Sequence, residues 1–359
     1  ADRLVWITTY NTLAHDGELV LNSNRMPIFA DWRERMRSVD RIAACPLLDR
    51  IGKRITNTSW TVQQLNGLLK DIREINRSVY LSVQKQLTTE LQQLAEYEVE
   101  YQLELFEEII PVRLAWRSPS RQQILSAVVT EPFEGALLKE WVAGMEEGRF
   151  NRMRNELRMG WVQGETIEQI SRRVRGTSGN AFRDGVLQIS RRSATSMVRT
   201  AVNSVATNAR EMLYAENDDL VKGVEWVSTL DLKTTPVCRA RDGKVFKPGK
   251  GPRPPAHIAC RSTTAPVVKS WRELGIDIDE APEGTRASMN GQVAADLTYN
   301  EWLKGQPVSV QDEVLGRAKG LLFRRGNLSM SHFVDATGRA YTLDELKRRE
   351  SAAWKKAGL

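Results

Sequence analysis

The sequence predicts a mainly α-helical protein with a smaller α+β part, and three observations support this prediction. Apolar residues recur every three or four positions over residues 59–110, as on one face of a helix. Residues 119–216 continue with further helical patterns. After Asp219 the pattern changes to short alternating segments that are typical of strands. We therefore expect a long-helix N-terminal arm over residues 1–148, a central α+β domain over 149–270 and a short α+β tail over 271–359.

The arm is dominated by residues 59–110, where Ser59 can cap a helix and Pro111 would end it. Only Gly67 interrupts the pattern, at a cost of about 1 kcal/mol relative to alanine. A helix of about 50 residues would span about 75 Å, so we expect it either to break into a hairpin or to pack along a partner. Residues 1–58 should combine irregular structure with short helices.

Residues 119–216 should form several helices, with breaks near Glu131–Pro132, in 144–148 and in 176–185. The last of these helices is expected over 187–216. The stretch from Arg149 to Arg210 contains twelve arginines and no lysine. It predicts either a solvated surface with ion pairs or a face that docks on an acidic protein or on DNA. The clustered candidates for docking are Arg172, Arg173, Arg175, Arg191 and Arg192.

The part after Asp219 should contain a small sheet. Strands are expected at 224–228, at 244–246 after an Asp242–Gly243 turn, and at 265–268, with Trp226, Phe246 and Val267 in the core. The tail should contain one hairpin over 333–342 and two helices that begin with capping boxes. The capping pairs are Thr298 with Glu301 and Thr342 with Glu345.

The overall charge and the cysteine content limit the class of protein. The formal net charge is +7, which favours acidic partners such as nucleic acid. The three cysteines, Cys45, Cys238 and Cys260, are too few for a disulfide framework and favour synthesis in a reducing cytoplasm. No stretch approaches roughly 18 uncharged apolar residues, so we expect no membrane span.

Residues 229–267 carry the most specific pattern in the chain. Cys238 precedes the Asp242–Gly243 turn, and a second element reads Pro254-Pro255-Ala-His257-Ile-Ala-Cys260-Arg261 before an apolar strand. This pattern resembles the signature of the bacteriophage Mu F-like minor head proteins, a family of head morphogenesis proteins. A looser similarity covers the helix that contains residues 199–210 and the tail around Trp302 and 321–326, so the resemblance extends over roughly 150–350.

The resemblance implies a structural protein of the virion that acts in head morphogenesis and is not an enzyme. Its expected partners are the phage portal protein, on which the arm would dock, capsid or scaffold proteins, and packaged DNA. Such a protein is made in the host cytoplasm, lies inside the head or at the portal vertex, and in some relatives leaves with the DNA. The resemblance implies no required cofactor.

The motif departs from its family at two positions, because Thr235 and Ser262 stand where many members have cysteine. The remaining Cys238, His257 and Cys260 could hold zinc, with Asp231 or Asp242 as additional oxygen ligands. The two cysteines could instead be small buried hydrophobic residues, or form a disulfide in released particles. For His257 we favour a hydrogen bond to a backbone carbonyl that braces the proline-rich loop. A Cys–His nucleophile remains a further alternative.

Three competing functions follow from the same residues. An HNH-type nuclease would need a catalytic histidine besides its metal ligands, yet only His257 of the three histidines lies in the motif. A toxin effector, such as an ADP-ribosyltransferase, would carry an extra C-terminal toxin domain. The tail over residues 271–359 is short and resembles the ordinary tail of the family, and no convincing Arg…Ser-Thr…Glu-x-Glu set is present. A DNA-binding ejection protein differs from the leading hypothesis only in where the protein goes after adsorption, and salt-sensitive DNA binding would support it.

Overall fold

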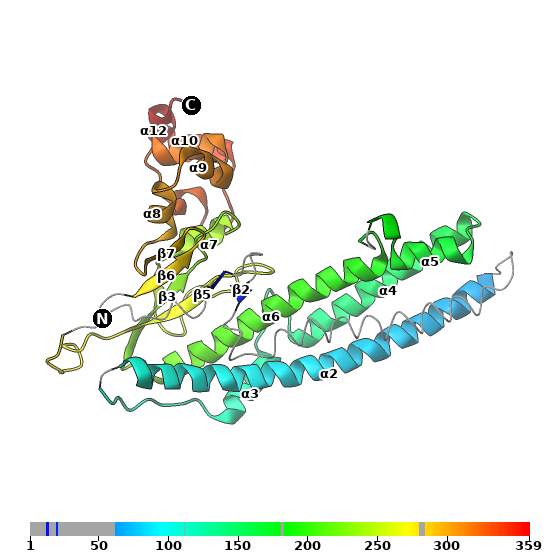
Figure 1. Cartoon of the computed structure of the whole chain (residues 1–359), viewed down its shortest axis with the longest axis horizontal. Helices are drawn as coiled ribbons and strands as arrows, with labels where there is room; N and C mark the ends of the chain where they lie inside the picture. Colours follow the sequence, from blue (N-terminus) through cyan, green and yellow to red (C-terminus); the bar gives the residue numbers. More distant parts are fainter. Residues whose placement is uncertain (1–11, 14–18, 21–61, 111, 181–182, 280–283) are drawn as a thin grey trace. The chain divides into compact units, whose positions relative to one another are not determined.

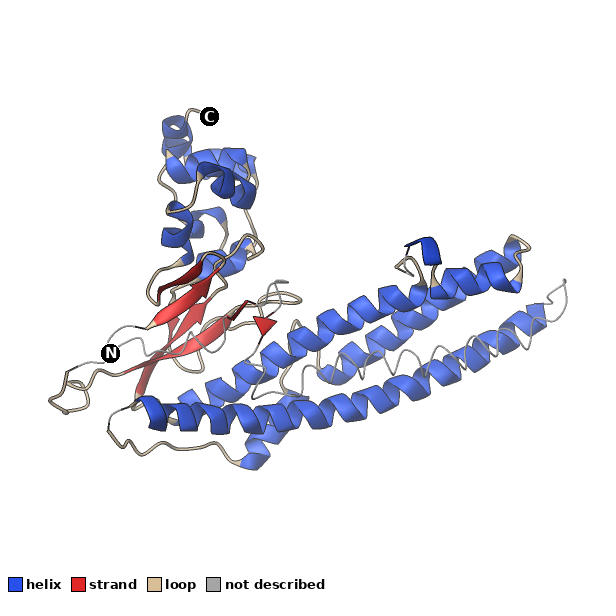
Figure 2. Cartoon of the chain, in the orientation of Figure 1, coloured by secondary structure: helices blue, strands red, loops and turns tan. Residues whose placement is uncertain are grey.

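The protein is described by a computed structural model over residues 12–13, 19–20, 62–110, 112–180, 183–279 and 284–359. These residues are mostly helical, with short antiparallel strands, as the sequence predicted (Figure 2). Two strands, β1 (Thr12–Leu13) and β2 (Leu19–Val20), pair with each other. The helices expected in 1–58 and the cap at Ser59 lie outside the described residues. None of the described helices combines the length and apolar composition needed to cross a membrane.

The chain divides into two compact units, of which one comprises residues 26–96 and 122–205. Its elements are α3 (Arg121–Thr130), α4 (Leu138–Val162), α5 (Ile167–Arg175), the short 3-10 helix η1 (Ser178–Asn180) and the first parts of α2 (Val62–Ile109) and α6 (Val186–Glu216). In Figure 1 the helices α2, α4 and α6 run alongside one another. Together with Ile170 of α5 they form a core that also contains Leu65, Leu68, Leu69, Ile72, Phe150, Met153, Leu157 and Val186.

The long helix α2 is continuous, so the expected break into a hairpin is wrong. It extends without interruption from Val62 to Ile109 and includes Gly67. Most of the apolar stripe that the sequence showed is buried, from Leu65 to Leu94, although Val62 is 59% exposed and Ile75 and Val79 are partly buried. Burial of each large apolar side chain stabilises the folded chain by about 1.5–3 kcal/mol. This exceeds the loss of helix stability of about 1 kcal/mol that one glycine causes relative to alanine.

The break predicted in 144–148 is also wrong, because α4 passes through Gly144 and Gly148. Val142 and Phe150, which flank this segment, are both buried. Their packing outweighs the weak helix propensity of the two glycines. The other predicted breaks are confirmed: α3 ends at Thr130, and α5 ends at Arg175, before α6 begins at Val186.

The second unit comprises residues 1–25, 97–121 and 206–359. It contains the last turns of α2 and α6, which are joined by buried polar contacts. Arg210 forms a 2.9 Å ion pair with Glu98, and the Tyr214 hydroxyl donates a 3.1 Å hydrogen bond to Gln102. The side chains of Glu98 and Arg210 are each only 2% exposed. Burial raises the pKa of Tyr214 well above its usual range, so this hydroxyl stays protonated as a donor.

The predicted small sheet is present in the second unit, with the strand order β4-β3-β5. Its strands are β3 (Val221–Val227), β4 (Val245–Phe246) and β5 (Thr263–Val268), and both pairings are antiparallel. Pro266 faces Val224 in the register. A proline is tolerated there because β5 lies at the edge of the sheet. Trp226 and Val267 are buried, and Phe246 is partly buried, so the predicted core residues are correctly identified.

A helix that the sequence reading missed lies between β3 and β4. Helix α7 (Pro236–Arg241) begins with a proline in its first turn, where the missing N–H is not needed. Asp242 follows its last residue, and Gly243 has a φ of +76°. The Asp242–Gly243 pair is therefore a turn that uses the positive φ of glycine, as predicted, but it leads from a helix into β4 and not from strand to strand.

A second hairpin was also missed, formed by β6 (Thr285–Ser288) and β7 (Gly291–Ala294). Asn290–Gly291 lies at its turn, and this dipeptide is a strong hairpin signal that the sequence reading overlooked. The hairpin predicted over 333–342 is reduced to one bridge between Val334 and Ala340, with Gly338 at a φ of +94° in the turn.

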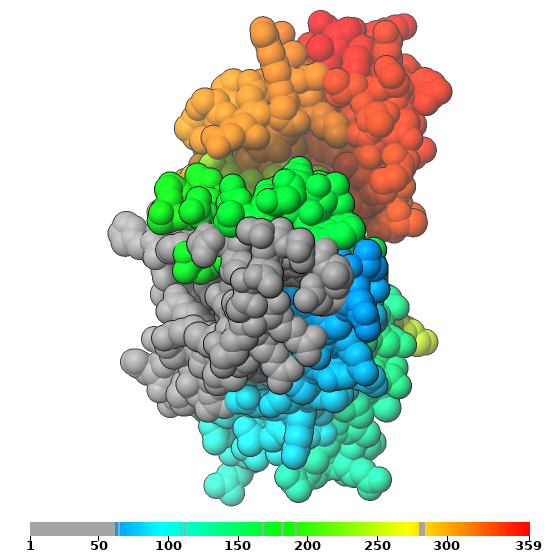
Figure 3. Space-filling model, turned by 90° about the vertical axis from the view of Figure 1, so that its right-hand side faces the viewer, coloured from blue at the N-terminus to red at the C-terminus, as the bar shows by residue number. Residues whose placement is uncertain are grey.

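The tail ends in five short helices and one 3-10 helix. They are α8 (Tyr299–Lys304), α9 (Val308–Leu315), α10 (Arg317–Arg324), η2 (Met330–Phe333), α11 (Leu343–Arg349) and α12 (Ser351–Ala357). Both predicted capping boxes are present, at Thr298 with Glu301 and at Thr342 with Glu345. These helices gather into one body, coloured orange to red in Figure 3, around a core that includes Trp302.

The division into 1–148, 149–270 and 271–359 remains a prediction. The two compact units are defined by packing and follow different boundaries, since α2 and α6 each contribute to both.

Candidate metal centre

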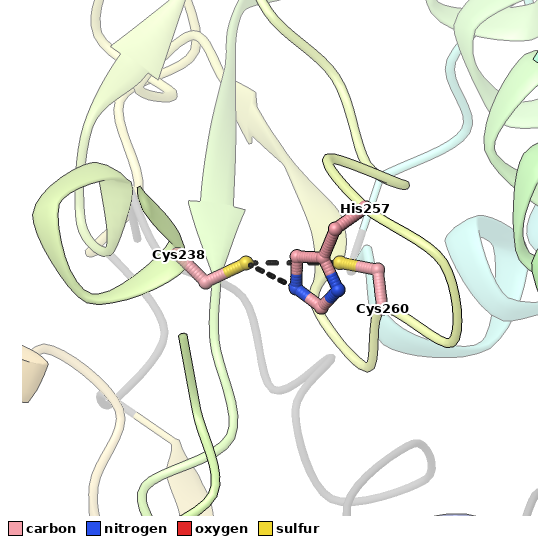
Figure 4. Close-up of side chains that lie close together, drawn as sticks. All are labelled: Cys238, His257 and Cys260. Carbon is pink, nitrogen blue, oxygen red and sulfur yellow. Dashed lines mark hydrogen bonds between the residues drawn. The ribbon is translucent and has the colours of Figure 1, made fainter. Parts of the chain in front are cut away.

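Three side chains of the motif meet at one point in the second unit. Cys238 projects from α7, whereas His257 and Cys260 belong to the loop that leads into β5 (Figure 4). The Cys238 Sγ atom lies 3.4 Å from Nε2 of His257 and 3.7 Å from Sγ of Cys260. All three potential ligand atoms lie within 4.8 Å of one another. The structure thus brings together the three residues that the sequence singled out as soft metal ligands.

Both sulfur atoms lie in an apolar environment. Cys238 is 1% exposed and Cys260 is 5% exposed, and both are free cysteines. The Trp226 side chain packs against them, together with Phe246 and Val237. The expected burial of the two cysteines is therefore confirmed. Burial at this level also argues against a nucleophilic thiol, because reactive cysteines are partly exposed.

The ring of His257 is oriented by the backbone. Its Nδ1 atom lies 3.0 Å from the carbonyl oxygen of Ile258, which can only accept a hydrogen bond. In the neutral ring, Nδ1 therefore carries the proton, and the lone pair of Nε2 faces Cys238. This is the kind of contact predicted for a bracing histidine, and it also presents Nε2 as a ligand.

The thiols influence each other's proton affinity. Their hydrogen bond raises the pKa of Cys238 and lowers the pKa of Cys260, and a hydrogen bond with His257 lowers the latter further. The guanidinium of Arg241 lies 5.1 Å from the ring centroid of Trp226, and burial lowers the pKa of this arginine.

The proline-rich loop before His257 is held by polar contacts of its own. Arg253 forms a 2.6 Å ion pair with Glu211 of α6, and both side chains are mostly buried. The backbone N–H of Gly249 donates a 3.2 Å hydrogen bond to the same carboxylate. The peptide bond between Pro254 and Pro255 is cis. These contacts fix the start of the loop independently of the Cys/His cluster.

Arg261, next to Cys260, is held by Asp231. Two guanidinium nitrogens contact the two carboxylate oxygens of Asp231 at 2.5 and 2.8 Å, in the bidentate geometry typical of such pairs. Burial tends to raise the pKa of Asp231, but the hydrogen bond and charge of Arg261, together with hydrogen bonds from Thr234 and the Lys233 backbone, lower this pKa overall. Asp231 is thus bound to Arg261 and is not one of the three side chains that could together hold a metal ion.

Asp242 is the centre of a buried polar network. Its carboxylate accepts hydrogen bonds from the backbone N–H of Ser228 at 2.6 Å and of Tyr299 at 2.6 Å. Arg286 on β6 contacts both carboxylate oxygens, at 3.0 and 3.2 Å, and the two side chains are only 0–1% exposed. Arg286 also donates to the carbonyl of Ser228. Asp242 therefore joins β3, α7, β6 and α8, and it is not a metal ligand in this arrangement.

Sequence reasoning missed Arg286, and no local signal could have found it. Its partner lies 44 residues earlier in the chain. It also missed the role of Ser228, whose hydroxyl donates to the Cys238 carbonyl at 2.9 Å and lies 3.1 Å from the Ser262 hydroxyl. Ser262 in turn forms a hydrogen bond with the Cys238 thiol.

The arginines proposed for docking differ in their surroundings. Arg173 is bound to Glu165 at 2.5 Å and to Glu156 at 3.1 Å, which agrees with the ion-pair interpretation. Arg172, Arg175 and Arg192 are exposed, and the side chain of Arg191 lies outside the described residues. Docking by the exposed members remains a prediction.

Chemically, the Cys/His cluster offers two sulfurs and one nitrogen. Such a set suits zinc or another soft ion, whereas magnesium prefers oxygen ligands. The nearby aspartates are bound to Arg261 and Arg286. The cluster consequently does not supply the oxygen-rich site that a magnesium-dependent nuclease would need.

Comparison with known proteins gives one match. The family model described as phage Mu protein F like protein matches residues 151–265, a range that includes Cys238, Asp242, His257 and Cys260. No curated protein and no solved structure matches the chain. The resemblance seen in the tail lies outside the matched range and stays a prediction. Residues 151–265 are therefore similar to the phage Mu protein F like family, and this similarity covers about a third of the chain.

Proposed function

We propose that the chain is a minor head protein that acts in phage head morphogenesis and binds the portal protein. The observation that carries this proposal is the match of residues 151–265 to the Mu F-like family, because similarity to this phage family implies a role in building the head. Capsid or scaffold proteins and packaged DNA are the other expected partners. Release of the protein with the DNA is a further prediction of the same resemblance.

The site chemistry supports a structural role over an enzymatic one. The charged groups of the motif are bound within the chain: Asp231 binds Arg261, and Asp242 binds Arg286, which lies outside the matched range. The two thiols are buried. These contacts stabilise a small sheet and its loops. They do not present a nucleophile or an oxygen-ligated ion to a substrate.

Portal binding is tested by co-expressing the full chain with the tagged portal protein of the same phage. We expect the two proteins to co-purify. Helix α2 belongs to the arm that is expected to dock, and its Leu81 is 59% exposed, so Leu81→Asp should weaken the complex without loss of a buried contact.

The matched control is Met159→Asp on α4. Met159 is 49% exposed and lies outside the predicted arm, so this variant should bind the portal as the wild type does. Failure of the wild-type chain to bind the portal oligomer would refute portal association. Equal binding by both variants would contradict a contact through this face of α2.

A further inference from the structure

We propose that Cys238, His257 and Cys260 bind a zinc ion through two thiolates and one imidazole, with water in the fourth position. The proposal does not depend on the role in the phage head. It concerns a cofactor that residues of this chain would hold, and it rests on the geometry of the three side chains (Figure 4).

The distances between the ligand atoms fit a tetrahedral zinc site. With zinc–sulfur bonds of about 2.3 Å and a zinc–nitrogen bond of about 2.0–2.1 Å, a tetrahedron requires about 3.8 Å between two sulfurs and about 3.5 Å between sulfur and nitrogen. The structure has 3.7 Å between the sulfurs of Cys238 and Cys260. It has 3.4 Å between Cys238 Sγ and His257 Nε2. An ion can therefore enter without a large movement of the backbone.

The contact behind the imidazole also matches a metal site. Histidines that bind a metal through one ring nitrogen usually donate the other N–H to a carboxylate or a backbone carbonyl. In His257 this second contact is the 3.0 Å hydrogen bond from Nδ1 to the carbonyl of Ile258. It leaves Nε2 directed at the sulfur of Cys238, where the lone pair would reach the ion.

The fourth position is next to a hydroxyl group and not a further thiol. Ser262 forms a hydrogen bond with the Cys238 thiol and is 4% exposed. A serine hydroxyl is a poor zinc ligand, so three protein ligands leave one position for water. The bound ion would connect α7 to the loop before β5 and so stabilise the chain around the small sheet.

The first test measures the metal content of the full chain, purified under reducing conditions without chelators, by elemental mass spectrometry. We expect about one zinc per chain, as for other sites of this donor set. Cys238→Ser and Cys260→Ser should lose the zinc. Cys45→Ser, which changes the remaining cysteine, should keep it. His257→Gln should bind zinc at least about tenfold more weakly, because even changes outside the ligand shell have effects of that size.

Two controls separate loss of metal from loss of folding. His332→Gln changes an exposed histidine outside the cluster and should keep the zinc. In the wild-type chain, removal of the ion with a chelator should lower the melting temperature, and addition of zinc should restore it. Cobalt(II) added to the same apo chain should give sulfur-to-metal charge-transfer absorption, which requires thiolate ligands.

A gain-of-ligand variant provides a positive test. Ser262→Cys places a third thiol beside Cys238 and should close the open position. The rate at which a competing chelator removes zinc from this variant should therefore be about tenfold lower than for the wild type. The proposal is overturned if the folded wild-type chain, with both thiols reduced, contains no zinc and takes up neither zinc nor cobalt. A disulfide between Cys238 and Cys260 in the freshly purified chain would overturn it as well.

Discussion

Replacement of Asp242 by alanine is expected to lower the free energy of unfolding by about 3–5 kcal/mol, the usual cost of removing one partner of a buried ion pair. The variant would leave the guanidinium of Arg286, only 1% exposed, without its carboxylate. It would also remove the acceptor for two backbone N–H groups, those of Ser228 and Tyr299. Chemical denaturation of the purified chain, followed by circular dichroism, measures this change.

The matched control is Asp219→Ala. Asp219 forms an ion pair with Arg117, but both side chains are more than half exposed, so little change in stability is expected. The double variant Asp242→Leu/Arg286→Met should recover part of the loss, because an apolar pair avoids an unpaired buried charge. If Asp242→Ala were as stable as the wild type, Asp242 would not be the centre of the network described above.

Replacement of Glu98 by alanine should have an effect of similar size, about 3–5 kcal/mol, because the buried guanidinium of Arg210 would lose the carboxylate that it contacts at 2.9 Å. Both side chains are 2% exposed, and their 2.9 Å contact joins α2 to α6. The hydroxyls of Thr207 and Thr263, at 3.3 and 3.0 Å from Arg210, are neutral and cannot replace the charge. Chemical denaturation again gives the measurement.

The control for this prediction is Glu147→Ala, which removes an ion pair with Arg73 in which the side chains are 44% and 51% exposed. Its effect should be small, since exposed pairs contribute little. A double-mutant cycle with Arg210→Met would isolate the interaction between Glu98 and Arg210. An interaction energy near zero in that cycle would contradict the coupling of α2 to α6 through this pair.

The elements that the sequence predicted are those governed by local patterns. The apolar spacing along α2 and α6 follows helical periodicity, and the capping boxes at Thr298 and Thr342 depend on residues three positions apart. The errors in α4 arose because tertiary packing around Phe150 outweighed the low helix propensity of two glycines. The turn at Asn290–Gly291 carried a usable signal that was overlooked.

The candidate site was predictable in part. The resemblance of residues 229–267 to the Mu F-like signature singled out Cys238, His257 and Cys260, but sequence alone could not show that Nε2 of His257 faces Cys238. The polar pairs that hold the fold depend on contacts across 44 residues for Asp242 with Arg286 and 112 residues for Glu98 with Arg210. Such pairs leave no periodic or local pattern, because their partners meet only after the chain has folded.

The most direct test of the proposed function is quantitative mass spectrometry of purified mature particles and of head assembly intermediates from the same phage. The amount of this chain is normalised to the portal protein. We predict that the chain is present at a low and constant ratio to the portal, as expected for a minor head protein. Absence of the chain from both mature particles and assembling heads would contradict the assignment to head morphogenesis.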